Sequence, residues 1–128
     1  GVRLPRSNEA DAFIDTVFEP DVVVVCDPTK LEPRGIRGAP DFVVEVLSPS
    51  TAGFDLIEKR QRYGLAGVRE IWLIDPLGGV LTIYRQDNGQ FGAPDIRRAE
   101  GEIELVSLPG LRLNLDFVTE LRDLNESA

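Results

Sequence analysis

Apolar residues gather in short, separated runs along the chain, a pattern typical of strands that are buried on both faces of a sheet. The clearest run, FVVEV, covers residues 42–46, and a second run, VVVVC, covers residues 22–26. Pro20 marks where the second strand begins, because proline is tolerated at the start of a strand but not in its middle. Residues 27–40 are rich in proline, glycine and charge, which predicts a loop. The two strands are therefore expected to pair antiparallel across that loop.

A helical spacing replaces the strand pattern between residues 55 and 67. Residues at three- and four-residue intervals share one side of a helix. On that basis one face carries Leu56, Lys59, Arg60 and Tyr63. The apolar run EIWLID at residues 70–75 follows directly, so strand, helix and strand form a βαβ unit with parallel strands.

The C-terminal third predicts antiparallel structure. Asn88-Gly89 lies between two strand-like stretches and is a strong hairpin signal. Two further short strands flank Pro109-Gly110, and residues 116–124 predict a short closing helix. The fold class is therefore α/β, with a mixed β-sheet, a βαβ unit, additional C-terminal hairpin strands and a short C-terminal helix. We expect residues 1–128 to form one domain, with structure missing before Gly1 because the chain lacks methionine.

The amino-acid composition limits which catalytic and binding functions the chain can have. The chain has no histidine, which excludes a Ser-His-Asp triad and histidine metal ligands, so carboxylates and lysine must carry any acid–base or metal chemistry. The net charge of −8 argues against binding nucleic acid through overall charge, although local basic clusters exist at Lys30 to Arg37 and Lys59 to Arg62. The single cysteine, Cys26, is expected to be a buried small hydrophobe and suits a reducing, cytoplasmic setting. No apolar run is long enough to span a membrane.

Two acids in otherwise apolar strands are the main chemical signal. Asp21 opens one strand and Glu45 lies within its expected neighbour, so both carboxylates are expected to converge at one end of the sheet. Oxygen ligands at such a point suit Mg²⁺ or Mn²⁺, with the backbone carbonyl of Val46 and water completing the shell. Buried carboxylates also serve as structural hydrogen-bond acceptors, and that alternative remains open.

Lys59 is the third candidate. A lysine on the helix face that packs on the sheet buries its stem and places its ammonium group near the acids. The alternative is an exposed pair between Asp55 and Lys59 at a spacing of four residues.

Other polar residues are expected to have structural roles. Asp27 and Asp75 are interpreted as turn residues, Trp72 as core, and Ser48, Ser50 and Thr51 as capping or loop residues.

Several of these motifs occur together in a known family. EPDVVVVCDP, GAPDFVVEVLSPST, the D…EK…Y helix and AGVREIWLIDP resemble the Uma-two family of bacterial restriction-endonuclease-like proteins in the PD-(D/E)XK nuclease superfamily. The resemblance runs from about Val17 to the end of the chain. It implies a nuclease core with Mg²⁺ between Asp21 and Glu45, and a helical N-terminal segment that this sequence lacks.

The resemblance implies an Mg²⁺-dependent endonuclease that acts on nucleic acid, with DNA expected. The superfamily pattern places lysine two residues after the glutamate, where this chain has Leu47, so the resemblance suggests that Lys59 replaces it from the helix. The alternative is a catalytically inactive DNA-binding or protein-interaction module on the same fold, and a purely structural domain is a third possibility. Exposed strand edges also suggest a homodimer.

Overall fold

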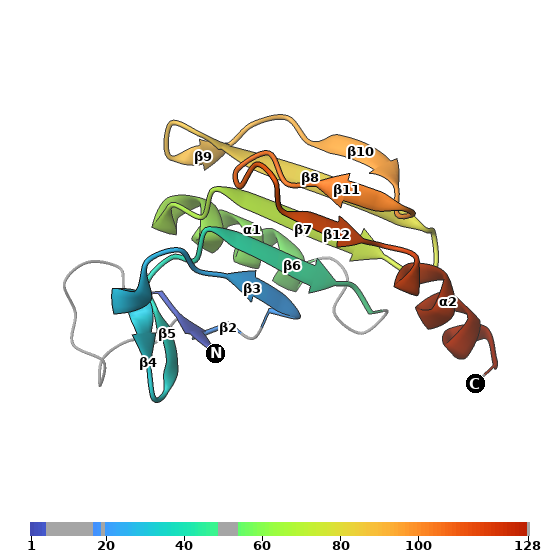
Figure 1. The fold of residues 1–128 in the computed structure, drawn as a ribbon, viewed down its shortest axis with the longest axis horizontal. Helices are drawn as coiled ribbons and strands as arrows, with labels where there is room; N and C mark the ends of the chain where they lie inside the picture. Colours follow the sequence, from blue (N-terminus) through green and yellow to red (C-terminus); the bar gives the residue numbers. More distant parts are fainter. Residues whose placement is uncertain (5–16, 19, 49–53, 128) are drawn as a thin grey trace.

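The computed structural model describes residues 1–4, 17–18, 20–48 and 54–127 (Figure 1). The strands are β1 (Val2–Arg3), β2 (Val17–Phe18), β3 (Val22–Val24), β4 (Leu31–Glu32), β5 (Gly35–Arg37), β6 (Phe42–Val46), β7 (Glu70–Asp75), β8 (Val80–Asp87), β9 (Gln90–Phe91), β10 (Asp95–Arg98), β11 (Glu102–Glu104) and β12 (Arg112–Asn114). The helices are the short 3-10 helix η2 (Pro28–Lys30), α1 (Phe54–Ala66) and α2 (Phe117–Ser127).

A mixed sheet in the order β10-β8-β7-β6-β3 forms the centre of the fold, and β9 pairs with β8 beside it. Strands β6 and β7 are parallel and are joined through α1, which confirms the predicted βαβ unit. The other pairings in this sheet are antiparallel, including β3 with β6, as expected from the two apolar runs. Two small sheets accompany it, β2-β1-β5-β4 and β11-β12.

Both faces of the central sheet are covered, which explains the continuous apolar runs. One face presents Phe42, Val44 and Trp72 to residues from β11, β12 and α2. Trp72 is fully buried and meets the Phe42 ring edge-on at 5.2 Å, so its predicted place in the core is confirmed. The opposite face packs against Tyr63 of α1 and against residues of β1 and β5 from the small sheet β2-β1-β5-β4. Glu45 belongs to this second face, because side chains alternate along β6.

The helices lie on opposite sides of the sheet. Helix α1 runs behind it, and α2 begins beside β12 and extends beyond the sheet (Figure 1). Helix α1 ends at Ala66, followed by Gly67 with a positive φ of 95°, the left-handed conformation that commonly ends helices. Within the described residues, no helix has the length and apolar character needed to cross a membrane.

The Asn88-Gly89 hairpin is confirmed. Asn88 and Gly89 have φ values of 50° and 86° between β8 and β9, as a tight two-residue turn requires. The prediction that residues 27–40 form only a loop is wrong, because this stretch contains η2 and the β4–β5 hairpin. Strand β5 pairs in parallel with β1, a contact between distant segments that local composition does not reveal.

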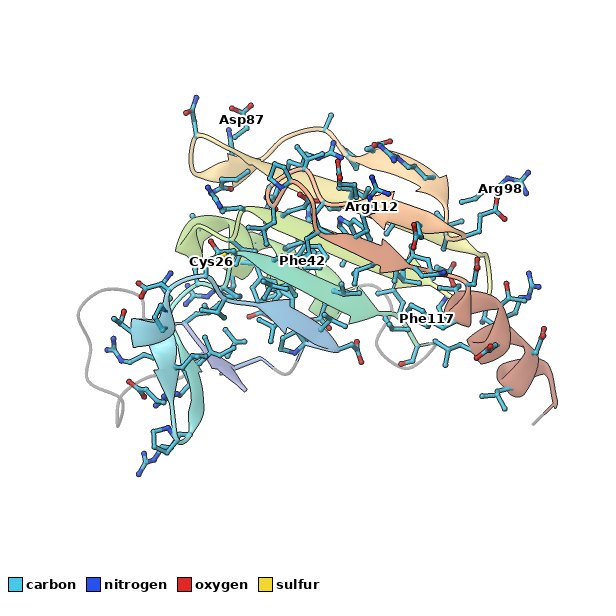
Figure 2. All side chains as sticks on the ribbon, in the orientation of Figure 1. Cys26, Phe42, Asp87, Arg98, Arg112 and Phe117 are labelled. Atoms are coloured by element: carbon cyan, nitrogen blue, oxygen red, sulfur yellow. The ribbon has the colours of Figure 1, made fainter. Side chains whose placement is uncertain are left out.

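The prediction that Cys26 is buried is also wrong. Strand β3 is an edge strand that ends at Val24, so the chain leaves the sheet before Cys26 and its side chain is exposed (Figure 2). The backbone N–H of Cys26 donates to Oδ2 of Asp41 at 2.7 Å, which fixes the chain just beyond the strand.

Candidate active site at the end of strands β3 and β6

Glu45 is buried near the end of β6, with 6% of its surface exposed. The hydroxyl of Tyr63 donates to its Oε1 at 3.0 Å, and the ammonium nitrogen of Lys59 lies 3.8 Å from its Oε2. Lys59 and Tyr63 are four residues apart on α1 and therefore lie on the same side of the helix. Helix α1 thus presents a hydrogen-bond donor to one carboxylate oxygen and a cation to the other.

The position of α1 depends on how its C-terminal end joins β7. The N–H of Val68, after the helix, donates to the carbonyl of Tyr63 at 3.0 Å, and the Val68 side chain is fully buried. The same buried cluster holds the Tyr63 ring, which is 1% exposed. A short, packed connection therefore sets which residues of α1 face Glu45.

Asp21 lies immediately before β3, at the same end of the sheet. The registered pairs run from Val22 with Val44 to Val24 with Phe42, and just before them the N–H of Asp21 donates to the carbonyl of Val44 at 3.0 Å. Oδ2 of Asp21 accepts the N–H of Val46 at 2.7 Å, so its carboxylate is held against the end of β6.

Val46 completes the candidate ligand set through its backbone. In an extended strand, the N–H and C=O of one residue point to the same side. The N–H of Leu47 bonds to Ile74 on β7, whereas that of Val46 turns to Asp21. The carbonyl of Val46 therefore points toward the side on which Asp21 lies.

The chemistry of these donors fits a hard divalent cation. Two carboxylates and a carbonyl offer only oxygen, which suits Mg²⁺ or Mn²⁺ and disfavours soft metals. Oδ1 of Asp21 forms no hydrogen bond with any other residue in the described part of the chain. Among the described residues, no three or more His, Cys, Asp or Glu side chains gather, so water would supply the remaining ligands.

The side chain of Asp55, the alternative partner of Lys59, lies outside the described residues, as does the side chain of Leu56. Ser50 and Thr51 also lie outside them. Leu47, at the position of the superfamily lysine, takes part in the sheet through its backbone N–H.

Two predicted turn residues have the expected roles. Asp27 precedes η2 and accepts the hydroxyl of Thr29 at 2.7 Å and its N–H at 2.9 Å. These bonds, the hydroxyl first, lower the pKa of the Asp27 carboxyl below its usual value. Asp75 accepts the N–H groups of Leu77 and Gly78 at 3.1 and 3.2 Å. Both acids stabilise turns.

Sequence reasoning missed a second buried glutamate. Glu70 opens β7 and is fully buried. Its two oxygens accept the indole N–H of Trp72 at 2.7 Å and the backbone N–H of Ser107 at 2.8 Å. The signal was present, because Trp72 follows two residues later on the same strand face. Among the described residues, Glu70 accepts only neutral donors, unlike Glu45, so it serves as a structural acceptor.

A family comparison extends over most of the chain. Residues 7–116 match the model of the Uma2 family, described as "putative restriction endonuclease". The chain belongs to the Uma2 family. This agrees with the motifs around Asp21 and Glu45, and it makes the protein restriction-endonuclease-like. No curated protein sequence matches the chain.

A solved structure shows the same fold. It is described as a "putative nuclease belonging to DUF820" from Anabaena variabilis, and it superposes with a TM-score of 0.59 at 21% sequence identity. The match covers 79% of this Uma2 chain and 59% of the other chain. The chain therefore spans less than two thirds of that neighbour's length, and the similarity supports the nuclease-like α/β architecture.

Proposed function

We propose that this Uma2 domain belongs to a metal-dependent endonuclease that hydrolyses phosphodiester bonds of DNA. The observation that carries the proposal is the position of Lys59, whose ammonium nitrogen lies 3.8 Å from the buried carboxylate of Glu45. A lysine beside an acid is the pair that the superfamily pattern calls for. Here the lysine comes from α1 and the acid from β6, so Leu47 does not deprive the site of a cation.

The residues that would hold Mg²⁺ or Mn²⁺ are Asp21, Glu45 and the carbonyl of Val46. When bound, such an ion polarises the scissile phosphate and lowers the pKa of an attacking water. The hydroxyl of Tyr63 fixes the orientation of the Glu45 carboxylate, because it occupies Oε1 from a buried position. Lys59 offsets negative charge that develops on the phosphate during attack.

A cleavage assay with matched variants tests this proposal. The intact protein is incubated with duplex DNA, single-stranded DNA and RNA in Mg²⁺, in Mn²⁺ and in EDTA. We expect metal-dependent cleavage of DNA, which Asp21→Asn and Glu45→Gln abolish. Lys59→Ala should keep metal affinity but lower the cleavage rate by about 100-fold or more, because its charge acts in the transition state. Equal cleavage by the parent and all three variants would refute the assigned site.

A second candidate is a catalytically inactive module that binds DNA or protein. It is favoured by the contacts of Glu45, whose carboxylate has a hydroxyl at one oxygen and an ammonium group beside the other. A structural role would need nothing more. Under this hypothesis Mg²⁺ titration by calorimetry shows no binding, and DNA is bound equally in EDTA and in Mg²⁺.

We also propose that the protein forms a homodimer in the cytoplasm. Strand β10 is an edge of the central sheet, and Ile96 on it is 65% exposed. An edge strand with an exposed apolar side chain favours pairing with a second copy. Light scattering of the intact protein should give twice the protomer mass at micromolar concentration. A protomer mass throughout that range would exclude the dimer.

A further inference from the structure

A groove lies between helix α1 and the β8–β9 hairpin. Its volume is about 450 Å³, and its lining includes Arg60, Gln61, Gly64, Leu65, Gln90 and Phe91. Arg60 and Gly64 contact β8 and β9, whereas Lys59 and Tyr63 contact Glu45 on β6. One helix therefore borders both the candidate active site and the groove, on different sides.

The walls of the groove are fixed by specific contacts. The side-chain amide of Gln86 on β8 donates to the carbonyl of Gly64 at 3.1 Å, which ties the hairpin to the end of α1. A Cβ atom at Gly64 would lie 3.3 Å from the ring of Phe91, so glycine permits the close approach of helix and hairpin. The groove is therefore preformed, as binding sites usually are.

Arg60 gives the groove a positive charge. Its guanidinium carbon lies 4.9 Å from the centre of the Tyr84 ring, a cation–π contact that holds the side chain in place. Tyr84 in turn packs against Phe91, with ring centres 6.0 Å apart. Within the described residues, no carboxylate forms an ion pair with Arg60. The charge of a held guanidinium therefore remains available to an anionic ligand.

We propose that this groove binds one nucleotide of a single-stranded stretch of the substrate, with the base against Phe91 and a phosphate at Arg60. The inference rests on the proposed nuclease function and assigns it a substrate subsite. Aromatic rings accept stacked bases of any sequence, and the amides of Gln61 and Gln90 suit hydrogen bonds to base edges.

The experiment measures binding without cleavage. The intact protein carrying Glu45→Gln is titrated in EDTA with a fluorescent single-stranded oligothymidylate, and anisotropy is recorded at several salt concentrations. Arg60→Gln removes the cation and Phe91→Leu removes the ring. Arg112→Gln is the matched control, because this exposed arginine lies on β12, which packs on the face of the central sheet opposite α1.

We expect Phe91→Leu and Arg60→Gln each to weaken binding about tenfold, and Arg112→Gln to weaken it less than twofold. Arg60→Gln should also reduce the salt slope by about 0.7, the value for one phosphate contact on a single strand. An oligomer with abasic sites should bind the parent and Phe91→Leu equally, since the ring then has no base to stack on. That pattern distinguishes stacking from a general loss of structure.

Different results would refute the nucleotide subsite and the proposed nuclease function. If the parent cleaves DNA but Arg60→Gln and Phe91→Leu bind like Arg112→Gln, the groove is not a nucleotide subsite, while the proposed nuclease function is supported. If no cleavage is found but the groove variants weaken binding as expected, the nucleotide subsite is supported and the proposed nuclease function is refuted. Absence of oligonucleotide binding by the parent overturns the subsite.

Discussion

The two buried glutamates provide the sharpest test of the candidate metal site, because the same substitution should affect them in opposite ways. Glu45→Gln keeps an oxygen for the Tyr63 hydroxyl and loses the charge opposite Lys59. The Lys59 side chain is 22% exposed and reaches water once its partner is gone, so the cost to stability should be about 1 kcal/mol. The loss to metal binding should be nearly complete, because a neutral amide does not offset the charge of the ion.

Glu70→Gln should have the opposite effect, lowering the stability of the fold rather than the affinity for metal. Both oxygens of Glu70 accept N–H groups, from Trp72 and Ser107, in a fully buried position. Glutamine would place an N–H group against one of these donors, which should cost about 1–3 kcal/mol. For a domain of this size, that corresponds to a fall in melting temperature of roughly 3–5 °C per kcal/mol. Metal binding should be untouched.

The assay is thermal unfolding of the intact parent, Glu45→Gln and Glu70→Gln with and without Mg²⁺. At an Mg²⁺ concentration about 100-fold above its Kd, the parent and Glu70→Gln should each gain about 2.7 kcal/mol, and Glu45→Gln almost nothing. An equal gain for all three proteins would refute metal binding by Glu45. A larger loss of apo stability for Glu45→Gln than for Glu70→Gln would show that Glu45 is the structural acceptor.

Two further predictions concern single side chains. Tyr63→Phe keeps the buried ring and removes the hydroxyl that holds Oε1 of Glu45, so Mg²⁺ affinity measured by calorimetry should fall about tenfold; unchanged affinity would exclude a positioning role. Desolvation around the thiol and the nearby Asp41 carboxylate raise the pKa of Cys26, so its alkylation by iodoacetamide should have a midpoint above the usual thiol pKa. Asp41→Asn should lower that midpoint, and an unchanged midpoint would contradict the assigned cause.

The central part of the fold was predictable from local patterns. Strand β6, helix α1 and strand β7 each have their own apolar signature, and the Asn88-Gly89 turn requires φ values that few other residues adopt. Strands β4 and β5 were missed, because they are only two and three residues long and β5 is completed by pairing with the distant strand β1. Cys26 was misjudged because an apolar run does not reveal where an edge strand ends.

The candidate site was partly predictable for the same reason. Asp21 and Glu45 stand out as acids in apolar runs, and helical spacing places Lys59 on the face of Tyr63. The bond from the Tyr63 hydroxyl to Glu45 depends on how α1 packs across the sheet, which spacing alone does not determine. Glu70 shows that a glutamate in an apolar strand is not specific for metal binding, because its neutral donors come from a nearby indole and a distant loop.

The two acids of the candidate site stand on strands that differ greatly in local stability. Strand β6 lies inside the sheet with four of its five residues buried, so its amides exchange with solvent only when the domain unfolds as a whole. Strand β3 has three residues at the sheet's edge, and such an edge opens in small local events. The hydrogen bond from the N–H of Val46 to Asp21 links the stable strand β6 to the less stable strand β3. A ligand that bridges Asp21 and Glu45 would therefore be seen in hydrogen exchange as slower opening of β3, while β6 would report only the gain in global stability.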